Sequence, residues 1–130
     1  MTETAAKVVD ASAIAAILFD EPDCDEISAR LTGSSLMAPA LIEFEIVNVC
    51  LTKMRRRAKD RDALLADFEI FSRMDITIRD VNVSGVLSLA EATDLTGYDA
   101  SYLWLALEQD AELVTLDKKL NEAVERLRAG

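Results

Sequence analysis

The stretch Lys7-Val8-Val9-Asp10-Ala11-Ser12 decides the fold of this chain. Two β-branched apolar residues predict a buried strand, which stops at a carboxylate followed by small residues that can begin a helix. In open α/β sheets, ligands bind beyond the carboxyl ends of the strands. Asp10 is therefore either the cap of the next helix, a position that Asp favours, or an acid delivered to a functional edge. Other acids reaching the same edge would favour the second interpretation.

Short strands and helices alternate along the rest of the chain. Further strands are expected at residues 36–38, 76–78 and 113–116. Helices are expected at residues 13–19, 23–31, 39–57, 60–74, 83–95, 98–109 and 117–127, with Pro39 at the first position of its helix. The helix over 98–109 is apolar nearly all round, which predicts a central place. The alternation is typical of an α/β protein with a largely parallel sheet.

The length and composition indicate one domain over residues 1–130, beginning with a polar lead at residues 1–6. A hydrophobic content of 51% is slightly rich for a small monomer, which indicates a buried partner surface. The chain lacks an apolar run of about eighteen residues, so we expect no membrane span. The first residues lack the basic start and apolar run of a signal peptide, so the expected location is the cytoplasm.

The chain contains no histidine, which excludes several classes of catalytic site. Ser-His and Cys-His nucleophile systems and His-ligated zinc are ruled out. Cys24 and Cys50 have no metal-type spacing and are expected to be buried or half-buried. The net charge of −10 opposes broad nucleic-acid binding, but it is compatible with a nuclease whose acids hold divalent cations.

Four carboxylates interrupt the apolar pattern. Asp10 ends the first strand and Asp117 follows the last one, so parallel strands would bring both to one edge. Asp99 lies in the first turn of the most apolar helix, where an acid also interacts favourably with the helix dipole. Glu45 has Leu41, Ile42 and Val49 as helix neighbours, which predicts an inward face. These positions leave open whether each acid is structural or part of a shared site.

Asn48 is expected on the same face as Glu45, where its amide would hydrogen-bond the carboxylate. Glu43 is about 140° from Asn48 around the helix and is expected to face solvent. Acids crowded together repel, at a cost of about 4 kcal/mol for two charges about 4 Å apart at an effective dielectric near 20. Hard cations, Mg²⁺ or Mn²⁺, suit an all-oxygen ligand set and relieve that repulsion.

Taken together, these residues resemble the PIN-domain nucleases, and most closely the VapC toxins of type II toxin–antitoxin pairs. The resemblance rests on four segments in a fixed order: Val8–Ser12, Ala38–Asn48, Leu95–Ala106 and Val114–Leu120. No single segment is decisive, but their order and spacing together are specific. The resemblance covers nearly the whole length after the first six residues.

The resemblance implies a three-layer α/β/α fold with a short central parallel sheet flanked by helices. It also implies Mg²⁺- or Mn²⁺-dependent cleavage of RNA by a metal-activated water, leaving 5′-phosphate and 3′-hydroxyl ends. Asp10 and Asp99 match the usual metal ligands. The full implied site comprises the acids Asp10, Glu45, Asp99 and Asp117 and the supporting residues Ser12, Asn48 and Thr115.

A basic run crosses the end of the helix expected over 39–57. Six of the fourteen basic residues lie between positions 53 and 61, among them the candidate RNA contacts Arg55, Arg56, Arg57 and Lys59. The run is either a solvated helix end, where cations favour the dipole, or a rim that contacts RNA phosphates.

Other functions fit less well. A receiver domain needs an acidic pair on its first strand, and a haloacid-dehalogenase-like phosphatase needs a second Asp where Ser12 stands. No glycine-rich phosphate loop is present. An inactive or housekeeping PIN-like interaction module remains the alternative.

The family resemblance implies a protein partner. We expect a small antitoxin whose apolar helix docks on the apolar segment Ala13–Phe19, with a basic residue reaching the acids around Asp10 and Asp99. Homodimers and toxin–antitoxin hetero-oligomers are also expected.

Overall fold

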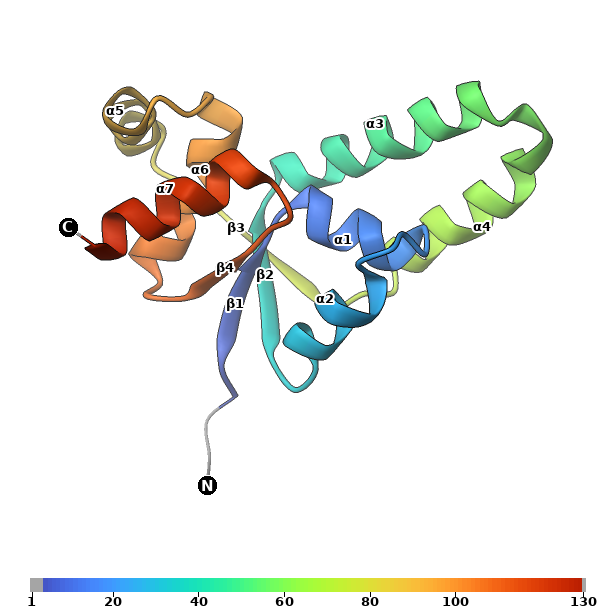
Figure 1. Ribbon diagram of the computed structural model, residues 1–130, viewed down its shortest axis with the longest axis horizontal. Coiled ribbons are helices and arrows are strands. Elements are labelled where there is room, and N and C mark those ends of the chain that lie inside the picture. The colour runs from blue at the N-terminus through green and yellow to red at the C-terminus, as the bar shows by residue number, and fades with distance from the viewer. Residues whose placement is uncertain (1–3, 130) are drawn as a thin grey trace.

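The computed structural model describes residues 4–129 and is organised around a four-stranded parallel sheet (Figure 1). Its order is β3-β2-β1-β4. The strands are β1 (Ala6–Val9), β2 (Ser35–Pro39), β3 (Ile76–Arg79) and β4 (Glu112–Val114). The helices are α1 (Ala11–Leu18), α2 (Cys24–Leu31), α3 (Leu41–Arg56), a 3₁₀ turn η1 (Ala58–Asp60), α4 (Arg61–Phe71), α5 (Val83–Thr93), α6 (Gly97–Glu108) and α7 (Lys118–Ala129).

The first strand lies in the middle of the sheet. Val8 is in register with Met37 of β2 on one side and with Leu113 of β4 on the other. Val8 and Val9 are fully buried, as expected for a strand covered on both faces. The sequence prediction of a buried first strand that stops at Asp10 is therefore confirmed.

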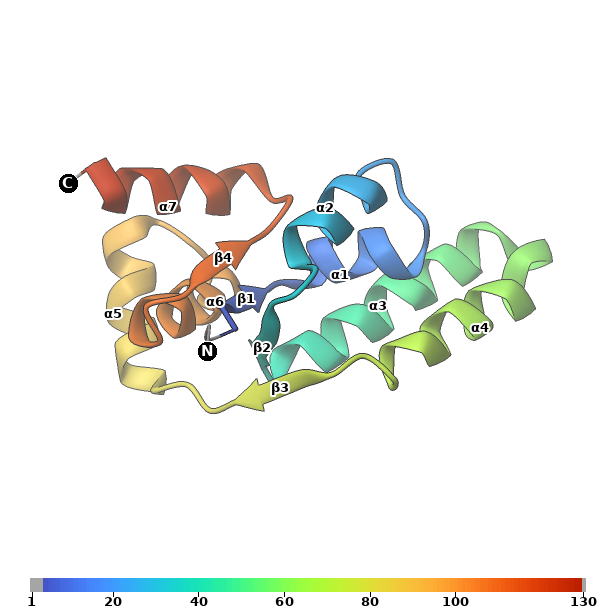
Figure 2. The ribbon, with the colours of Figure 1, turned by 90° about the horizontal axis from the view of Figure 1, so that it is seen from below.

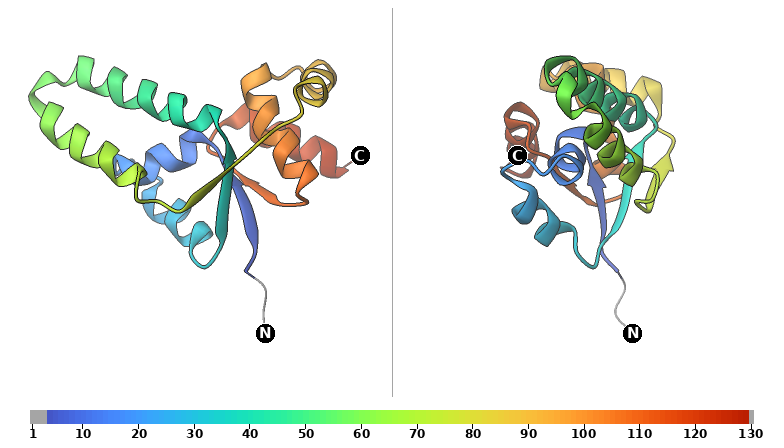
Figure 3. Two further views of the ribbon diagram at one scale, coloured as in Figure 1. Left: turned by 180° about the vertical axis from the view of Figure 1, so that it is seen from behind. Right: turned by 90° about the vertical axis from the view of Figure 1, so that its right-hand side faces the viewer.

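Helices cover both faces of the sheet, in the three-layer arrangement predicted from the sequence. Helices α1 to α4 lie on one side, and α5, α6 and α7 lie on the other (Figures 1 and 3). Helix α6 packs on β1, β2 and β4 and buries Tyr102, Leu103 and Leu105. Its predicted central place is thus confirmed. Helices α3 and α4 lie side by side and project as an arm from the body (Figure 2).

The strand order places a topological switch between β1 and β4. From β1 the chain adds β2 and then β3 in one direction, and it then crosses back to place β4 on the opposite side of β1. Open parallel sheets bind ligands at such a switch, beyond the carboxyl ends of the strands. Asp10 and Asp117 follow the two strands that flank it.

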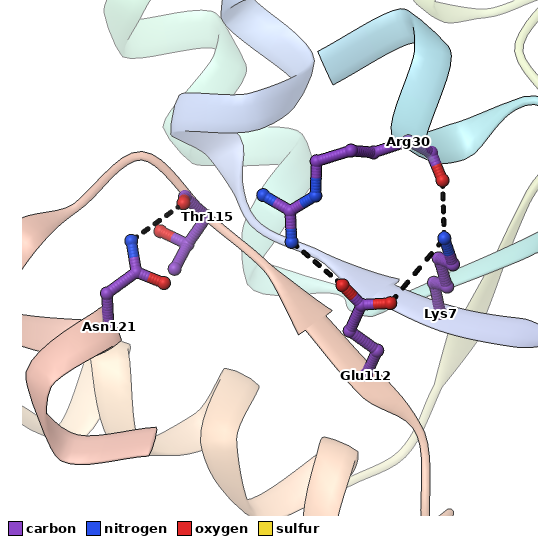
Figure 4. A network of polar contacts seen from close by, with 5 residues as sticks. All are labelled: Lys7, Arg30, Glu112, Thr115 and Asn121. Carbon is purple, nitrogen blue, oxygen red and sulfur yellow. Dashed lines mark hydrogen bonds and ion pairs between the residues drawn. The ribbon is translucent and has the colours of Figure 1, made fainter. Parts of the chain in front are cut away.

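An ionic cluster ties strands β1 and β4 to helix α2 (Figure 4). The Glu112 carboxylate accepts a hydrogen bond from the Arg30 guanidinium at 2.8 Å and pairs with the Lys7 ammonium at 3.5 Å. The Lys7 ammonium also donates to the Arg30 carbonyl. The hydrogen bond from Arg30 lowers the pKa of Glu112, against a smaller opposing effect of burial. This cluster fixes the β1–β4 pair at the end of the sheet away from Asp10.

Two sequence predictions are wrong. Pro39 does not begin a helix: it ends β2 in register with Arg79 of β3, and α3 starts at Leu41. Proline is compatible with the end of a strand, where its missing N–H costs little.

The second wrong prediction is that the apolar segment Ala13–Phe19 offers a groove to a partner. Ile14, Leu18 and Phe19 are at most 9% exposed, because α1 packs on α2, α3 and α4 within the same chain. The segment's apolar character reflects an internal position, which a sequence cannot distinguish from an external interface.

No helix within residues 4–129 has the length and apolar character needed to cross a membrane. Cys24 is half-buried and Cys50 buried, and both are free thiols, as expected.

Candidate functional site

Asp10 is held rigidly at the carboxyl end of β1. Its Oδ1 accepts hydrogen bonds from the Ser12 hydroxyl at 2.7 Å and from the Ala13 amide at 3.1 Å. Its Oδ2 accepts one from the Thr115 hydroxyl. The Ala13 bond is an N-cap of α1, so Asp10 caps a helix and also presents an oriented carboxylate. The two interpretations of this residue are thus compatible.

The two hydroxyls predicted to support the acids lie beside them. The hydroxyl oxygens of Ser12 and Thr115 are 3.3 Å apart, and the Ser12 oxygen also accepts a hydrogen bond from the Leu116 amide at 2.9 Å. The Thr115 carbonyl is held in turn by the side-chain amide of Asn121 at 3.0 Å (Figure 4). These bonds fix the turn after β4 against the start of α1.

Asp117 immediately precedes α7 and is half-buried. Its Oδ1 accepts the amide of Leu120 at 2.9 Å, and its own amide donates to the Thr115 hydroxyl at 3.0 Å. Asp117 therefore caps a helix as Asp10 does, with its other oxygen free of protein donors among the described residues.

Asp99 lies in the first turn of α6 and is half-buried. Its backbone amide donates a hydrogen bond at 3.1 Å to the Thr96 side chain, which caps the helix. The Asp99 carboxylate itself accepts no hydrogen bond from residues 4–129. It is thus the least constrained of the four candidate acids.

Glu45 is reached by a residue for which the sequence suggested no role. The hydroxyl of Tyr102, on α6, donates to Glu45 Oε1. Asn48, the partner expected from the sequence, is exposed, and its side chain makes no hydrogen bond with the described residues. Asn48 comes three residues after Glu45 and lies about 60° from it around the helix, but it is about 200° from the buried Ile46 and faces solvent. Among the described residues, the hydrogen bond to Glu45 therefore comes from Tyr102 and not from Asn48.

The charges of the four acids interact with one another. Burial raises the pKa of Asp10, against the hydrogen bonds from Thr115, Ser12 and Ala13, and the charge of Asp117 raises it further. Burial also raises the pKa of Glu45 above its ordinary range; the Tyr102 hydrogen bond opposes this, and the charges of Asp10 and Asp99 add to it.

The pKa of Asp99 follows the same pattern. It is raised first by burial, then by the charges of Asp117 and Asp10, and Lys119 opposes the shift. Each of the four acids thus repels at least one other. None of them takes part in an ion pair within the described part of the chain.

The donor set fits a hard divalent cation. All four groups are carboxylates that repel one another, and the charge of Lys119 offsets this only in part, at Asp99. Within residues 4–129, no three Asp, Glu or Cys side chains form a ready-made metal cage. Mg²⁺ is commonly held by only one or two carboxylates, and it keeps water molecules and substrate phosphates in its remaining positions. An open arrangement of acids is compatible with that mode of binding.

The basic run lies at the far end of α3, away from the acids. Arg55, Arg56, Arg57 and Lys59 are exposed, and none forms an ion pair with the described residues. Lys53 differs, because it pairs with Glu21 at 3.0 Å and lies 5.4 Å from the centre of the Phe19 ring. Lys53 is thus part of the packing between α1 and α3, whereas the other four are available to a ligand.

Two residues beside the acids, Tyr102 and Asn121, were not predicted from the sequence. Each follows an acid along one helix face: Tyr102 comes three residues after Asp99, and Asn121 four residues after Asp117. Such spacing places two side chains together on a helix. Helical spacing from the candidate acids was thus the feature that would have identified both.

Comparisons with known proteins place the chain in a class. A family model described as the PIN domain matches residues 7–125, so the chain belongs to the PIN domain family. Proteins of this family are generally nucleases. The resemblance inferred from the four sequence segments is therefore confirmed. No curated protein sequence matches the chain.

Two solved structures share the fold. PAE2754 from Pyrobaculum aerophilum is 25% identical with a TM-score of 0.73, over 93% of this chain and 87% of that one. Mycobacterium tuberculosis VapC20, described as a toxin that cleaves the sarcin-ricin loop, is 16% identical with a TM-score of 0.63, over 90% of this chain and 94% of that one. At this identity, the likeness to VapC20 establishes a common fold.

Proposed function

We propose that this chain is a Mg²⁺- or Mn²⁺-dependent endoribonuclease that acts as the toxin of a toxin–antitoxin pair. One observation carries the proposal: Asp10 after β1 and Asp117 after β4 both hydrogen-bond the Thr115 hydroxyl at the topological switch, and the charges of Glu45 on α3 and Asp99 on α6 interact with this pair. Membership of the PIN family and the fold shared with an RNA-cleaving toxin support it.

In the proposed mechanism, Asp10 and Asp99 hold the cation, and Glu45 and Asp117 complete or support its surroundings. When bound there, a divalent cation would supply a water of lowered pKa and would stabilise negative charge on the scissile phosphodiester. Ser12 and Thr115 keep the Asp10 carboxylate oriented before the cation arrives. Without a cation, the acids repel the RNA phosphates, so substrate binding at this edge depends on the metal.

Arg55, Arg56, Arg57 and Lys59 bind the RNA backbone on the arm formed by α3 and α4. They are exposed and free of ion pairs among the described residues, so RNA phosphates meet no competing carboxylate. These contacts carry no sequence information, because they involve only phosphates. They hold the RNA while the acids act on one bond.

The decisive experiment is RNA cleavage with and without Mg²⁺. Purified protein should cleave RNA only when Mg²⁺ or Mn²⁺ is present, and Asp10→Asn should reduce cleavage to background. The products should carry 5′-phosphate ends. Cleavage that persists in EDTA, or in the Asp10→Asn variant, would contradict the proposed mechanism.

The toxin role implies a small antitoxin protein that binds the chain in the cytoplasm. Its docking surface differs from Ala13–Phe19, which is internal; exposed apolar side chains are instead found on α3 (Phe44, Val47) and α5 (Val83, Leu87). The same side chains suit a homodimer, and a toxin–antitoxin hetero-oligomer would follow. Overexpression should arrest growth, Asp10→Asn should not, and co-expression of the neighbouring small open reading frame should rescue growth.

The alternative is a catalytically inactive or housekeeping PIN-like module. A chain that folds and binds metal, yet neither cleaves RNA nor arrests growth, would support that alternative. The complete set of four acids argues against it.

A further inference from the structure

Tyr102 connects the two helix layers directly at the candidate site. It lies on α6, on one side of the sheet, and its hydroxyl donates to Glu45 Oε1 on α3, on the other side (Figure 1). The two residues are 57 positions apart. Tyr102 is only 1% exposed, so the protein holds its ring in one place, whereas Glu45 is half-buried. The tyrosine is therefore the fixed partner and the glutamate the one that is positioned.

The bond also distinguishes the two oxygens of Glu45. Oε1 accepts the Tyr102 hydroxyl, while Oε2 accepts no hydrogen bond from residues 4–129. A free glutamate at the edge of a helix samples several rotamers. Burial of the tyrosine together with this hydrogen bond restricts Glu45 to conformations that keep its carboxylate near Asp10 and Asp99, whose charges it experiences.

We propose that Tyr102 is a positioning residue, which orients Glu45 so that only Oε2 is available to the divalent cation. This inference rests on the proposed metal-dependent function. Mg²⁺ requires nearly octahedral geometry and short bonds, whereas Ca²⁺ accepts one or two oxygens of a carboxylate in flexible arrangements. A glutamate with one oxygen already engaged therefore favours Mg²⁺ over Ca²⁺. Tyr102 sets both the affinity for Mg²⁺ and this preference.

The test is a metal titration of the full chain that follows melting temperature, with no RNA present. A cation that binds only the folded state raises the melting temperature in a saturable way. Tyr102→Phe should increase the Mg²⁺ concentration for half-maximal stabilisation by about tenfold or more, as loss of a group that orients a ligand typically does. The Ca²⁺ midpoint should change less, so that the preference of the protein for Mg²⁺ over Ca²⁺ decreases.

Tyr98→Phe is the matched control. Tyr98 lies on the same helix, is 66% exposed, and its hydroxyl makes no hydrogen bond with the described residues. Its removal should leave both midpoints unchanged. Each variant is compared with its own metal-free melting temperature, so a general loss of stability does not mimic the effect.

A double-mutant cycle with Glu45→Gln tests whether Tyr102 acts through Glu45. If Tyr102 acts through Glu45, Tyr102→Phe should not change the Mg²⁺ midpoint further in the Glu45→Gln background. Should Tyr102→Phe fail to fold, Glu45→Asp replaces it, because the shorter carboxylate keeps its charge but cannot reach the Tyr102 hydroxyl. The Mg²⁺ midpoint should rise in that variant too.

Three outcomes overturn the inference. Equal Mg²⁺ midpoints in the wild type and Tyr102→Phe would show that the hydrogen bond to Glu45 only satisfies the buried Tyr102 hydroxyl and has no role in metal binding. A full effect of Tyr102→Phe in the Glu45→Gln background would place its action elsewhere. A wild-type chain that Mg²⁺ does not stabilise would remove the proposed metal-dependent function, and the inference with it.

Discussion

The two ends of α3 differ in almost every physical respect. Near its start, Glu45 is half-buried, hydrogen-bonded to Tyr102 and repelled by two other acids. Ten residues later, about 15 Å along the helix axis, Arg55 begins an exposed basic run without ion pairs among the described residues. One helix therefore separates the groups proposed for chemistry from those proposed to hold RNA. The acid end should respond to metal and pH, and the basic end to salt.

The largest effect is expected from Asp99→Asn, at the acid end. Cleavage should fall to background because a proposed cation ligand is removed. The fold should stay intact or become more stable, since the Asp99 carboxylate accepts no hydrogen bond from the described residues and is repelled by Asp117 and Asp10. Activity and melting temperature are measured on the same preparation. Unfolding many degrees below the wild type would make Asp99 a structural residue.

A smaller effect is expected when Arg55, Arg56 and Arg57 are replaced together by Gln. RNA binding should weaken and its salt dependence flatten, by about one unit of slope for each phosphate that the protein no longer neutralises. Melting temperature and the Mg²⁺ midpoint should not change, because these side chains are exposed at the opposite end of the helix.

The control for the basic end carries the same change of charge elsewhere. Arg73, Arg79 and Arg126 are exposed arginines outside the run, and their joint replacement by Gln should leave the salt slope near that of the wild type. Equal slopes for the two triple variants would show that the run is only a solvated helix end.

A further contrast concerns pH in the absence of metal. The pKa values of Asp10, Glu45 and Asp99 are raised, chiefly by burial, so the folded state binds more protons than the unfolded one between the ordinary and the raised values. Stability from this region should therefore increase as pH falls through that interval, and decrease as pH rises through it.

Thermal unfolding of the metal-free chain over a pH series checks this sign. The combined variant Asp10→Asn, Glu45→Gln and Asp99→Asn should flatten the profile, whereas the arginine triple variant should leave it unchanged. A stability that decreases steadily from neutral pH into this interval, in a way that the acid variant abolishes, would reverse the assigned sign.

The smallest effect is expected from Asn121→Ala. Its amide donates to the Thr115 carbonyl at 3.0 Å and so supports Asp10 through an intermediate residue. Removal of one such hydrogen bond should reduce the free energy of unfolding by about 1 kcal/mol, with a correspondingly modest decrease in cleavage. Asn82→Ala is a useful comparison, because Asn82 caps α5 at a distance from the acids.

The strand and helix pattern was predictable because its causes are local. Val8 and Val9 identify a buried strand, and apolar spacing identifies the central helix that contains Tyr102. Pro39 was misassigned because proline suits both a helix start and a strand end, and only the register with β3 distinguishes the two.

The sequence indicated the four candidate acids and the two hydroxyls that bond Asp10, but not the partner of Glu45. The positions of Asp10 and Asp117 after strands indicate a common edge, the helix positions of Glu45 and Asp99 made them candidates, and the family resemblance implied that all four form one site. Helical periodicity locates a face only approximately, so Asn48 was expected beside Glu45. The hydroxyl that reaches Glu45 belongs instead to Tyr102, on a different helix. The Ala13–Phe19 segment shows the same limit, since apolar content does not tell an internal contact from an external one.

The bond between Thr115 and Asp10 spans 105 residues, and this has a consequence for biosynthesis. A ribosome makes Asp10 early, yet the carboxylate gains the hydroxyl that orients it only once β4 has been synthesised and has emerged. Contacts this distant in sequence form late in folding, since closing a long loop is entropically costly. A partly translated chain would thus lack the oriented Asp10 carboxylate on which the proposed cleavage depends.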